Sequence, residues 1–310
     1  MALHPAPTIV LQLDRESAKR GFLQRLAGEL VWCDLPLTSD ATDADLTTRP
    51  RSAPDRTWTA IYDGPGLVAG GLERIRSARG DLGSYRVTHA DGENFILSSD
   101  GSSIRRQAPP SNELPLPDIS RALGAPLALA LALREIYLLH ASAIAFPDGS
   151  VIALTAVSGG GKSTLAGAAS AHLTQGLRRV ADDQLPVRLG RSPAALPHFP
   201  QLKLRPQDQY PADASPAVAF RALVELQVDP ACDAAELVRE TGPEAIQSLV
   251  RATVASKLFD REMLTQHFNA CASAALVLPV YRLRYPHALD RLDEALALLT
   301  SLPSVAPLVP

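Results

Sequence analysis

Hydrophobic and polar residues alternate in several short stretches of the first third of the chain. Residues 8–13 alternate in this way, and so do short runs between residues 58 and 105, such as Tyr85-Arg-Val-Thr-His. The pairs Asp91-Gly92 and Asp100-Gly101 interrupt these runs, and Asp-Gly pairs are typical of tight hairpin turns. Because alternation with period two gives a strand one buried face, the pattern predicts small antiparallel strands.

A different period occurs in residues 15–30, where apolar residues recur at helical spacing. The residues on the apolar side are Phe22, Leu23, Leu26 and Leu30. This spacing predicts a helix. Residues 38–56 are polar and contain proline, which predicts a mobile loop. The first third is therefore expected to form an α+β module.

Residues 108–117 separate this module from the rest of the chain. The segment reads Ala-Pro-Pro-Ser-Asn-Glu-Leu-Pro-Leu-Pro, and its prolines oppose both a helix and a central strand. Segments of this composition are typical of linkers. We therefore predict an N-terminal α+β module over residues 1–107, a linker over residues 108–117 and a second domain over residues 118–310.

Helical and strand patterns alternate in the second domain, which predicts an α/β fold. Asp118 can cap an Ala- and Leu-rich helix, and this helix can break at Pro126. Two strands are expected next, over residues 137–146 and 151–157, joined by the tight turn Asp148-Gly149. The second strand runs directly into glycines, so two neighbouring strands lead to one loop.

Composition indicates a globular protein without an excess of positive charge. Lys and Arg number 30 against 33 for Asp and Glu, so neither nucleic acid nor an anionic membrane is an expected partner. The richest apolar run, residues 127–133, is too short for a bilayer, which takes about 20 residues. Cys33, Cys232 and Cys271 are widely spaced and show no metal-ligand pattern. With no secretory pattern at the N-terminus, we expect a cytoplasmic protein.

The segment Ser158-Gly-Gly-Gly-Lys-Ser-Thr164 has the pattern of a phosphate-binding loop. It departs from the usual pattern only at Ala156, which stands where the first glycine is common. The glycines let backbone N–H groups turn toward phosphate oxygens, and a helix over residues 162–171 would favour an anion at its N-terminus. The motif therefore predicts that the chain binds a nucleoside triphosphate.

Seven residues are expected to hold the nucleotide: Ser158, Gly159, Gly160, Gly161, Lys162, Ser163 and Thr164. Lys162 would reach the β and γ phosphates, the Ser163 hydroxyl would coordinate Mg²⁺, and Thr164 would be mainly structural. The alternative is a glycine-rich turn that caps a helix and binds nothing, but the order of strand, loop, Lys-Ser pair and helix argues against it. The loop by itself does not choose between an ATPase, a GTPase and a small-molecule kinase.

A pair of carboxylates follows the helix. Residues 177–181 predict a short strand that ends in Asp182 and Asp183. Neighbouring residues of a strand point to opposite faces of the sheet, so Asp182 and Asp183 can serve one site only where the strand ends in a loop. Pro186 favours such an end. We assign Asp182 as the general base and Asp183, with Ser163, as the Mg²⁺ ligands, although the reverse assignment is open. The alternative is an acidic turn on the surface.

His140 lies in the strand that precedes the phosphate-loop strand. By period-two counting it shares a face with Leu138 and Ser142. A histidine among apolar residues is more often a hydrogen-bonded core group than a catalyst. Taken alone, the residues around His140 favour a structural role.

Three motifs together resemble the HPr kinase/phosphorylase superfamily, whose phosphate loop belongs to the phosphoenolpyruvate-carboxykinase-like fold. The motifs are His140-Ala-Ser-Ala, Ser158-Gly-Gly-Gly-Lys-Ser-Thr-Leu165 and Ala181-Asp-Asp183. The chain looks more like the shorter HPr-kinase-like proteins found with ribosomal-peptide clusters, including lasso-peptide precursor kinases. Residues 199–205 and 279–285 are also similar to stretches in that group, so the resemblance extends over residues 120–290.

The resemblance implies a kinase that phosphorylates a serine of a precursor peptide. It implies that His140 lies beside the transferred phosphate, that Lys162 and Ser163 bind nucleotide and metal, and that the acidic pair contains the base. His140 thereby joins Asp182 and Lys162 as a candidate catalytic residue. HPr kinases are oligomers, so a homo-oligomer is a further expectation.

The chain departs from the bifunctional HPr enzymes at Thr164, where they carry an acidic residue, and it has no counterpart of their dephosphorylation signature. Both differences argue against phosphorylase activity. Lys203 and Arg205 can bring positive charge near a phosphate or an acidic peptide, or can form a solvated basic strand. Weaker candidates are Arg282 and Arg284. The Arg-rich residues 74–86 and the predicted hairpins of the first third are alternative candidate surfaces for substrate recognition.

The leading hypothesis is an ATP- and Mg²⁺-dependent kinase that acts on a serine of a peptide or small protein, such as a ribosomal precursor peptide. One alternative is a kinase for a small metabolite. Another is a peptide-binding module whose binding is controlled by a nucleotide and which transfers no phosphate. A kinase should lose turnover but keep its nucleotide affinity when its base is changed, whereas a binding module should keep its function.

Overall fold

The computed structural model describes residues 9–12, 20–27, 29–33, 42–45, 56–68, 71–107, 119–171, 176–201, 203–205, 208, 210–211, 214–286 and 288–304. The chain forms two compact units. The first consists of Met1–Ile136 and Val254–Gln266, and the second consists of Tyr137–Thr253 and His267–Pro310. The predicted linker at residues 108–117 lies outside the described residues. Because the division falls after Ile136, the Ala- and Leu-rich segment belongs with the N-terminal unit. Both units mix helices with extensive sheets, so the expected mixture of α and β structure is confirmed.

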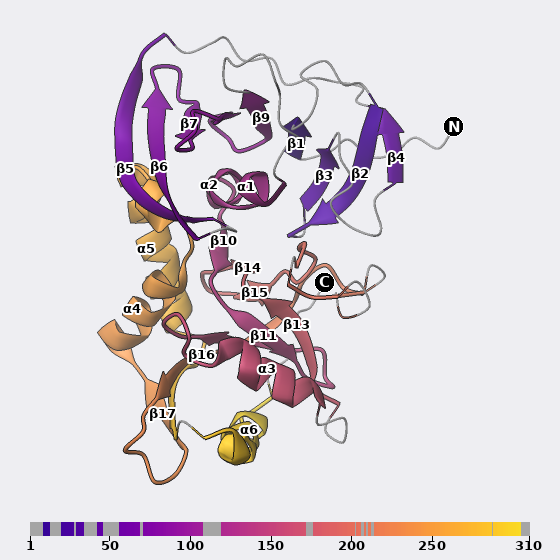
Figure 1. Cartoon of the computed structure of the whole chain (residues 1–310), viewed down its shortest axis with the longest axis vertical. Coiled ribbons are helices and arrows are strands. Elements are labelled where there is room, and N and C mark those ends of the chain that lie inside the picture. The colour runs from indigo at the N-terminus through magenta and orange to yellow at the C-terminus, as the bar shows by residue number, and fades with distance from the viewer. Residues whose placement is uncertain are drawn as a thin grey trace. The chain divides into compact units, whose positions relative to one another are not determined.

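The described part of the first unit is built on one sheet with the strand order β4-β2-β3-β1-β9-β8-β7-β6-β5 (Figure 1). Its strands are β1 (Ile9–Gln12), β2 (Arg20–Leu26), β3 (Glu29–Cys33), β4 (Thr42–Asp45), β5 (Trp58–Val68), β6 (Gly71–Gly80), β7 (Tyr85–Thr88), β8 (Asn94–Leu97) and β9 (Ser103–Gln107). Neighbouring strands are antiparallel except where β1 pairs with β3 and with β9.

The predicted hairpins between β7, β8 and β9 are confirmed. Tyr85 and Val87 are buried on β7, as are Phe95 and Leu97 on β8, while the residues between them are partly exposed. Gly92 and Gly101 occupy the turns with φ of +90° and +69°. At Gly101 a Cβ atom would also lie 2.2 Å from the Ala130 carbonyl oxygen, so this turn needs glycine for space as well as for conformation.

The helix predicted over residues 15–30 is wrong, because this region contains β2 and β3. Phe22 pairs with Cys33 and Leu26 with Glu29, and Ala27 turns the chain with a φ of +50°. Pairing within a large sheet overrides the local helical spacing. The strand predicted over residues 8–13 is confirmed as β1.

The loop predicted over residues 38–56 contains β4, which pairs with β2. The prediction of a loop is therefore wrong for these four residues. Residues 38–41 and 46–55 lie outside the described residues. The strand forms because β2 leaves an edge that β4 can join, an opportunity that local composition does not reveal.

The predicted Ala- and Leu-rich helix forms two pieces, α1 (Ile119–Leu123) and α2 (Ala125–Ala132). The break occurs at Gly124, and Pro126 is accepted in the first turn of α2, where its missing N–H leaves no helical hydrogen bond unmade. All eight residues of α2 are buried, and the helix packs against β8 and β9. Asp118, the expected cap, lies outside the described residues.

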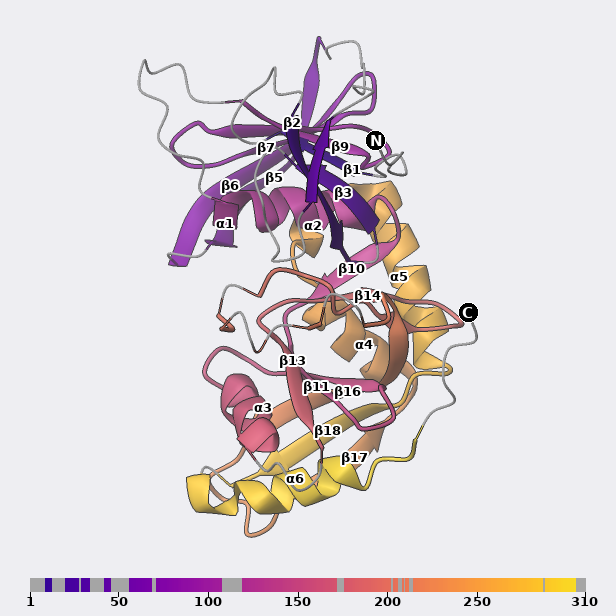
Figure 2. The same cartoon turned by 90° about the vertical axis from the view of Figure 1, so that its right-hand side faces the viewer.

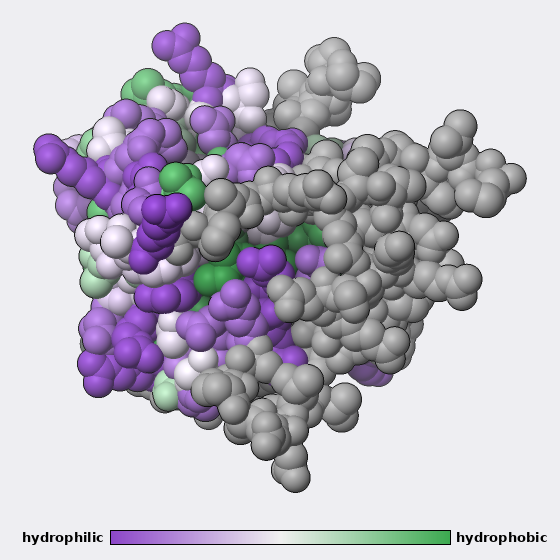
Figure 3. Space-filling view, turned by 90° about the horizontal axis from the view of Figure 1, so that it is seen from above, coloured by the Kyte–Doolittle hydropathy of each residue, from purple (hydrophilic) through white to green (hydrophobic). Residues whose placement is uncertain are grey.

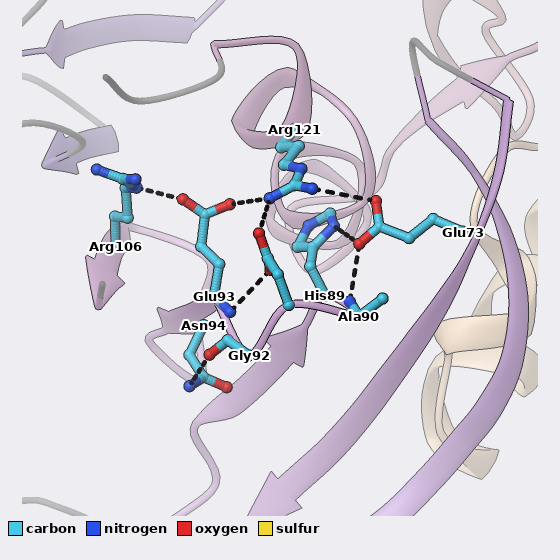
Figure 4. A network of polar contacts seen from close by, with 9 residues as sticks. Glu73, His89, Ala90, Gly92, Glu93, Asn94, Arg106 and Arg121 are labelled. Atoms are coloured by element: carbon cyan, nitrogen blue, oxygen red, sulfur yellow. Dashed lines mark hydrogen bonds and ion pairs between the residues drawn. The ribbon is translucent and has the colours of Figure 1, made fainter. Parts of the chain in front are cut away.

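Arg121 on α1 joins three carboxylates from different parts of the sheet (Figure 4). Its guanidinium nitrogens lie within 3.5 Å of oxygens of Glu73, Asp91 and Glu93. Glu93 also pairs with Arg106 on β9, and both of these side chains are almost fully buried. The network therefore fixes α1 to β6, to the turn between β7 and β8, and to β9.

The described surface of the face seen in Figure 3 is mainly hydrophilic, with hydrophobic residues showing in small patches. Among the described residues, no helix is long and apolar enough to cross a membrane.

The described part of the second unit has a sheet with the order β10-β14-β15-β16-β12-β11-β13, and β18 pairs with β16 and with β17. Its strands are β10 (Ile136–Leu139), β11 (Ser142–Ala145), β12 (Val151–Thr155), β13 (Arg178–Asp182), β14 (Leu185–Arg188), β15 (Ala194–Ala195), β16 (Val218–Val228), β17 (Glu236–Glu240) and β18 (Val280–Tyr285). β12, β16 and β18 run parallel, whereas β11 is antiparallel to β12 and β13.

Helices cover this sheet. The residues Leu154, Val224 and Leu283 pack into one core with Leu165 of α3 (Lys162–Ala171) and Leu296 of α6 (Leu292–Thr300). Figure 2 shows α3 beside β11 and β13, and the helix contacts both strands. α4 (Gly242–Ala252) also belongs to this unit, and α5 (Arg261–Ala275) has residues in both units. α4 contacts β18.

The strand predicted over residues 137–146 forms as two strands, β10 and β11, with His140 and Ala141 between them. Continuous pairing stops because the His140 N–H donates to the Ala252 carbonyl, while Ala141 exchanges two backbone hydrogen bonds with Asp183. His140 was expected to lie on one strand with Leu138 and Ser142, but it lies between two strands.

Replacing Glu93 by Gln should destabilise the first unit by about 3 kcal/mol, because Arg106 and Arg121 would lose a buried charged partner. Trp32 and Trp58 are the two tryptophans of the chain and both belong to this unit. Urea unfolding followed by tryptophan fluorescence therefore reports on it. The matched control is Asp63→Asn, which removes an exposed pair with Arg74 and should have little effect. Equal stability of the two variants would contradict a stabilising role for the network.

The second unit should lose stability as the pH falls from 6.5 to 4. Burial lowers the pKa of His267 to about 4 from an ordinary 6.5. Between these values the unfolded chain binds a proton that the folded chain does not, so the free energy of unfolding should fall by about 3 kcal/mol. Circular dichroism during urea unfolding at several pH values measures this, and His267→Phe should flatten the dependence. The same slope in both proteins would exclude His267 as its cause.

Candidate nucleotide-binding site

The predicted phosphate loop connects β12 to α3. β12 ends at Thr155, two residues before the predicted end of the strand, and α3 begins at Lys162, as the sequence predicted. Gly159 and Gly161 have φ values of +78° and +82°, which residues with a Cβ rarely adopt. The Gly160 N–H donates to the Val157 carbonyl at 2.9 Å and closes a turn within the loop.

Two of the glycines are also required for space. A Cβ atom on Gly161 would lie 2.3 Å from the Tyr285 hydroxyl, and one on Gly160 would lie 2.7 Å from the Ala156 Cβ. Ala156 itself does not have a positive φ, so its position accepts a side chain. This explains why the chain can depart from the usual glycine there while it keeps the three that follow.

Lys162 and His140 are in direct contact. Lys162 Nζ lies 3.2 Å from His140 Nε2 and 3.3 Å from the Ala156 carbonyl oxygen. Burial, with help from the Lys162 charge, lowers the pKa of His140, so the imidazole is neutral at pH 7. The neutral ring can then accept from Lys162 at Nε2 and donate from Nδ1.

Asp183 contacts the other ring nitrogen of His140, Nδ1. His140 Nδ1 lies 3.2 Å from the Asp183 carbonyl oxygen and 3.3 Å from its carboxylate. Lys203 Nζ lies 3.2 Å from the other carboxylate oxygen. Lys162, His140, Asp183 and Lys203 thus form one chain of polar contacts.

Asp182 points to a different set of partners. Its Oδ1 accepts hydrogen bonds from Ser163 Oγ at 2.6 Å and from Ser142 Oγ at 2.8 Å. Its backbone N–H donates to Gln201 Oε1 at 2.9 Å, and Arg179 Nη1 lies 3.4 Å from Oδ2. The side chain is buried, so Asp182 is held firmly beside the first turn of α3.

The backbone at Asp183 explains how two adjacent carboxylates serve one site. β13 ends at Asp182, and Asp183 has a φ of +127°. Its N–H and C=O both bond to Ala141, at 3.1 and 3.2 Å. The chain therefore turns at this residue, so that the Asp182 side chain reaches Ser163 while the Asp183 side chain reaches His140 and Lys203. Such strain in a residue other than glycine costs about 1–3 kcal/mol.

The structure brings together most of the residues that the sequence singled out. Lys162, Ser163, His140, Asp182 and Asp183 lie within one cluster of contacts. The exposed Ser158 and Thr164 belong to the loop and to the first turn of α3. Sequence reasoning did not assign roles to Ser142, Arg179 or Gln201. Ser142 and Gln201 stand in the motif segments 140–143 and 199–205, which was the available signal.

The other basic candidates have partners of their own. Arg205 pairs with Asp208 at the surface. Arg282 pairs with Glu240, and Arg284 with Asp229 and Glu236. Among these basic candidates, Lys203 is the one that contacts the acidic pair, through Asp183.

Ser163, Asp182 and Ser142 offer hard oxygen donors of the kind that Mg²⁺ prefers. The Ser163 hydroxyl and the Asp182 carboxylate are already within 2.6 Å of one another. Among the described residues, no group of three or more His, Cys, Asp or Glu side chains is placed to hold a metal. Mg²⁺ is usually held by one or two carboxylates together with phosphates, so this donor set fits Mg²⁺ bound with a nucleotide.

Comparisons of the chain with protein-family models and with curated proteins found no match.

Asp183→Gly should be more stable than Asp183→Ala by about 1–3 kcal/mol. Both changes remove the carboxylate and its contacts with His140 and Lys203, but only glycine relieves the positive φ. Urea unfolding followed by circular dichroism gives the difference. Equal stability of the two variants would show that the backbone at this position carries no strain.

Proposed function

We propose that the protein is an ATP- and Mg²⁺-dependent kinase that transfers the γ-phosphoryl group to a serine of a peptide or small protein. We further propose that its second unit is an HPr-kinase-like phosphate-loop core. The observation that carries the proposal is the convergence of Lys162, His140 and Asp183 in one chain of contacts, beside a Ser163–Asp182 pair. A glycine-rich turn that only caps a helix would not require these partners.

The phosphate loop supplies the anion-binding part of the site. Gly159 and Gly161 have positive φ values, a conformation that lets backbone N–H groups turn toward an anion, and the helix N-terminus adds a favourable dipole. Lys162 Nζ contacts two neutral groups, the His140 imidazole and the Ala156 carbonyl. Its charge is therefore available to the β and γ phosphates.

The contacts favour an exchange of the two carboxylate roles first assigned from the sequence. Asp182 bonds to Ser163 Oγ, the hydroxyl expected at the metal, so Asp182 and Ser163 would hold Mg²⁺. A metal ion held there supplies positive charge that neutralises the phosphate oxygens. Asp183 is one-third exposed and lies between His140 and Lys203, so it would accept the proton of the incoming hydroxyl.

The transfer follows from these positions. The serine oxygen attacks the γ-phosphorus while the bond from that phosphorus to the β–γ bridging oxygen breaks, so that ADP leaves and phosphoserine forms. The serine proton passes to the Asp183 carboxylate and then to water. Neutral His140 holds both Lys162 and Asp183, so it positions the cation and the base relative to each other.

The choice of a peptide serine as acceptor rests on the motif resemblance and on the exposure of the base. The side chains of Asp183 and Lys203 are 34% and 60% exposed, so a serine on a larger chain can reach them. Lys203 can offer its charge to the transferred phosphoryl group or to acidic residues near the serine.

A phosphoryl-transfer assay tests the proposal. Purified protein, Mg-ATP labelled at the γ-phosphate and serine-containing peptides encoded beside its gene should give labelled phosphoserine. Asp183→Asn should lower kcat by about 10²–10⁴-fold and leave the affinity for Mg-ATP nearly unchanged. Asp182→Asn should weaken the binding of Mg-ATP more than that of ATP without Mg²⁺. The matched control is Asp233→Asn, an exposed change that should alter neither quantity.

Two results would contradict the proposal in different ways. If ATP binds but no peptide is labelled, the peptide-kinase function fails. If Asp182→Asn abolishes turnover and keeps the Mg²⁺ dependence of binding, Asp182 is the base and the roles are those first assigned from the sequence.

A further inference from the structure

We infer that a pocket beside the phosphate loop, on the side of β16, holds the nucleoside part of the nucleotide. The inference rests on the proposed nucleotide binding and names a part of the site that the phosphate loop does not define. The pocket has a volume of about 450 Å³, within the range of about 300–1,000 Å³ common for small-molecule sites. The lining residues that matter to the argument are Val157, Glu225, Gln227, Val228, Arg251 and Arg282.

The position of the pocket matches the direction in which a nucleotide would lie. The strand order places β16 on one side of β12, and β11 and β13 on the other. Asp182, at the end of β13, and His140, just before β11, therefore lie on the side of the loop away from β16. With the γ-phosphate held among these groups, the nucleoside at the other end of the triphosphate would leave the loop toward β16. The pocket includes Val157, Ser158, Gly159 and Gly160, so it is continuous with the loop.

Its walls suit a flat, uncharged ring. Val157 is 81% exposed and stands at the beginning of the loop, where it offers an apolar surface. Arg251 on α4 is fixed in place because its guanidinium donates to Glu225 at 2.9 Å and lies 3.3 Å from the Ser248 hydroxyl. A guanidinium held in this way can still stack its face on an aromatic base. The exposed Gln227 amide can both donate to and accept from the edge of a base.

The charges of the pocket argue against a phosphate or an acidic peptide as its occupant. Arg251 is already paired with Glu225, and Arg282 with Glu240 at 2.7 Å. These carboxylates neutralise the two guanidinium groups, so none of the described residues that line the pocket offers the unpaired cation that an anion would need. Lys162, whose contacts are neutral, provides that cation within the loop. The structure therefore separates a phosphate site from a neutral pocket beside it.

Isothermal titration calorimetry with Mg-ATP and with Mg-tripolyphosphate tests the assignment, because tripolyphosphate keeps the phosphates and lacks the nucleoside. Wild type should bind ATP at least about tenfold more tightly than tripolyphosphate. Arg251→Gln should weaken ATP binding by about 3- to 30-fold and leave tripolyphosphate binding unchanged. Val157→Ser, which changes no charge, should weaken ATP binding by about three- to tenfold.

Two controls separate failure of this inference from failure of the proposed function. Lys162→Ala should weaken both ligands, and Arg239→Gln, an exposed arginine on β17 outside the pocket, should change neither. If wild type binds neither ligand, nucleotide binding itself fails. If wild type binds both ligands equally, or if Arg251→Gln and Val157→Ser leave ATP binding unchanged, the loop binds phosphate but the nucleoside is elsewhere. If these variants change only the KM for a peptide acceptor, the pocket belongs to the acceptor and the inference is overturned.

Discussion

The two backbone hydrogen bonds between Ala141 and Asp183 join the segments on which the candidate site depends. They hold the end of β13 against the residues between β10 and β11, and they turn the backbone of Asp183 to a positive φ. Because of that turn, Asp182 faces Ser163 while Asp183 faces His140. Two adjacent carboxylates on a regular strand would point to opposite faces of the sheet and could not share one site. The strained backbone of Asp183 thus allows Asp182 and Asp183 to contact different residues within one site.

The sequence was most informative where structure depends on local rules. The phosphate loop and α3 could be placed because glycines, a Lys-Ser pair and helical spacing act within a few residues of one another. Residues 15–30 show the opposite case, since their apolar spacing is helical but β2 and β3 form through pairing in a sheet. The break at His140 depends on Ala252 and Asp183, which lie far away in the sequence. For the same reason, the motif segments that contain Ser142 and Gln201 did not reveal that both residues contact Asp182.

The two sides of the phosphate loop differ in how their charges are balanced. On the side of β16, Arg251 and Arg282 each have a carboxylate partner. On the side of β11 and β13, Lys162 contacts a neutral imidazole and a carbonyl group, and Asp183 lies between that imidazole and Lys203. A ligand that is an anion at one end and an uncharged ring at the other matches this difference. A uniformly charged ligand would match only one of the two sides.

The protonation of Lys162 would depend on whether a phosphate is bound in the loop. Burial lowers the pKa of Lys162, because the ammonium group has exchanged water for neutral partners. A phosphate in the loop would place negative charge beside this group and raise its pKa again. The charges of Asp183 and Asp182 act in the opposite direction to burial, and a phosphate bound in the loop would add to their effect. In the first unit the buried arginine Arg106 has a carboxylate partner within the fold, Glu93, so its charge contributes to stability without any ligand. Arg106 and Lys162 thus differ in their partners, because Arg106 is paired with a carboxylate while Lys162 is hydrogen-bonded to neutral groups.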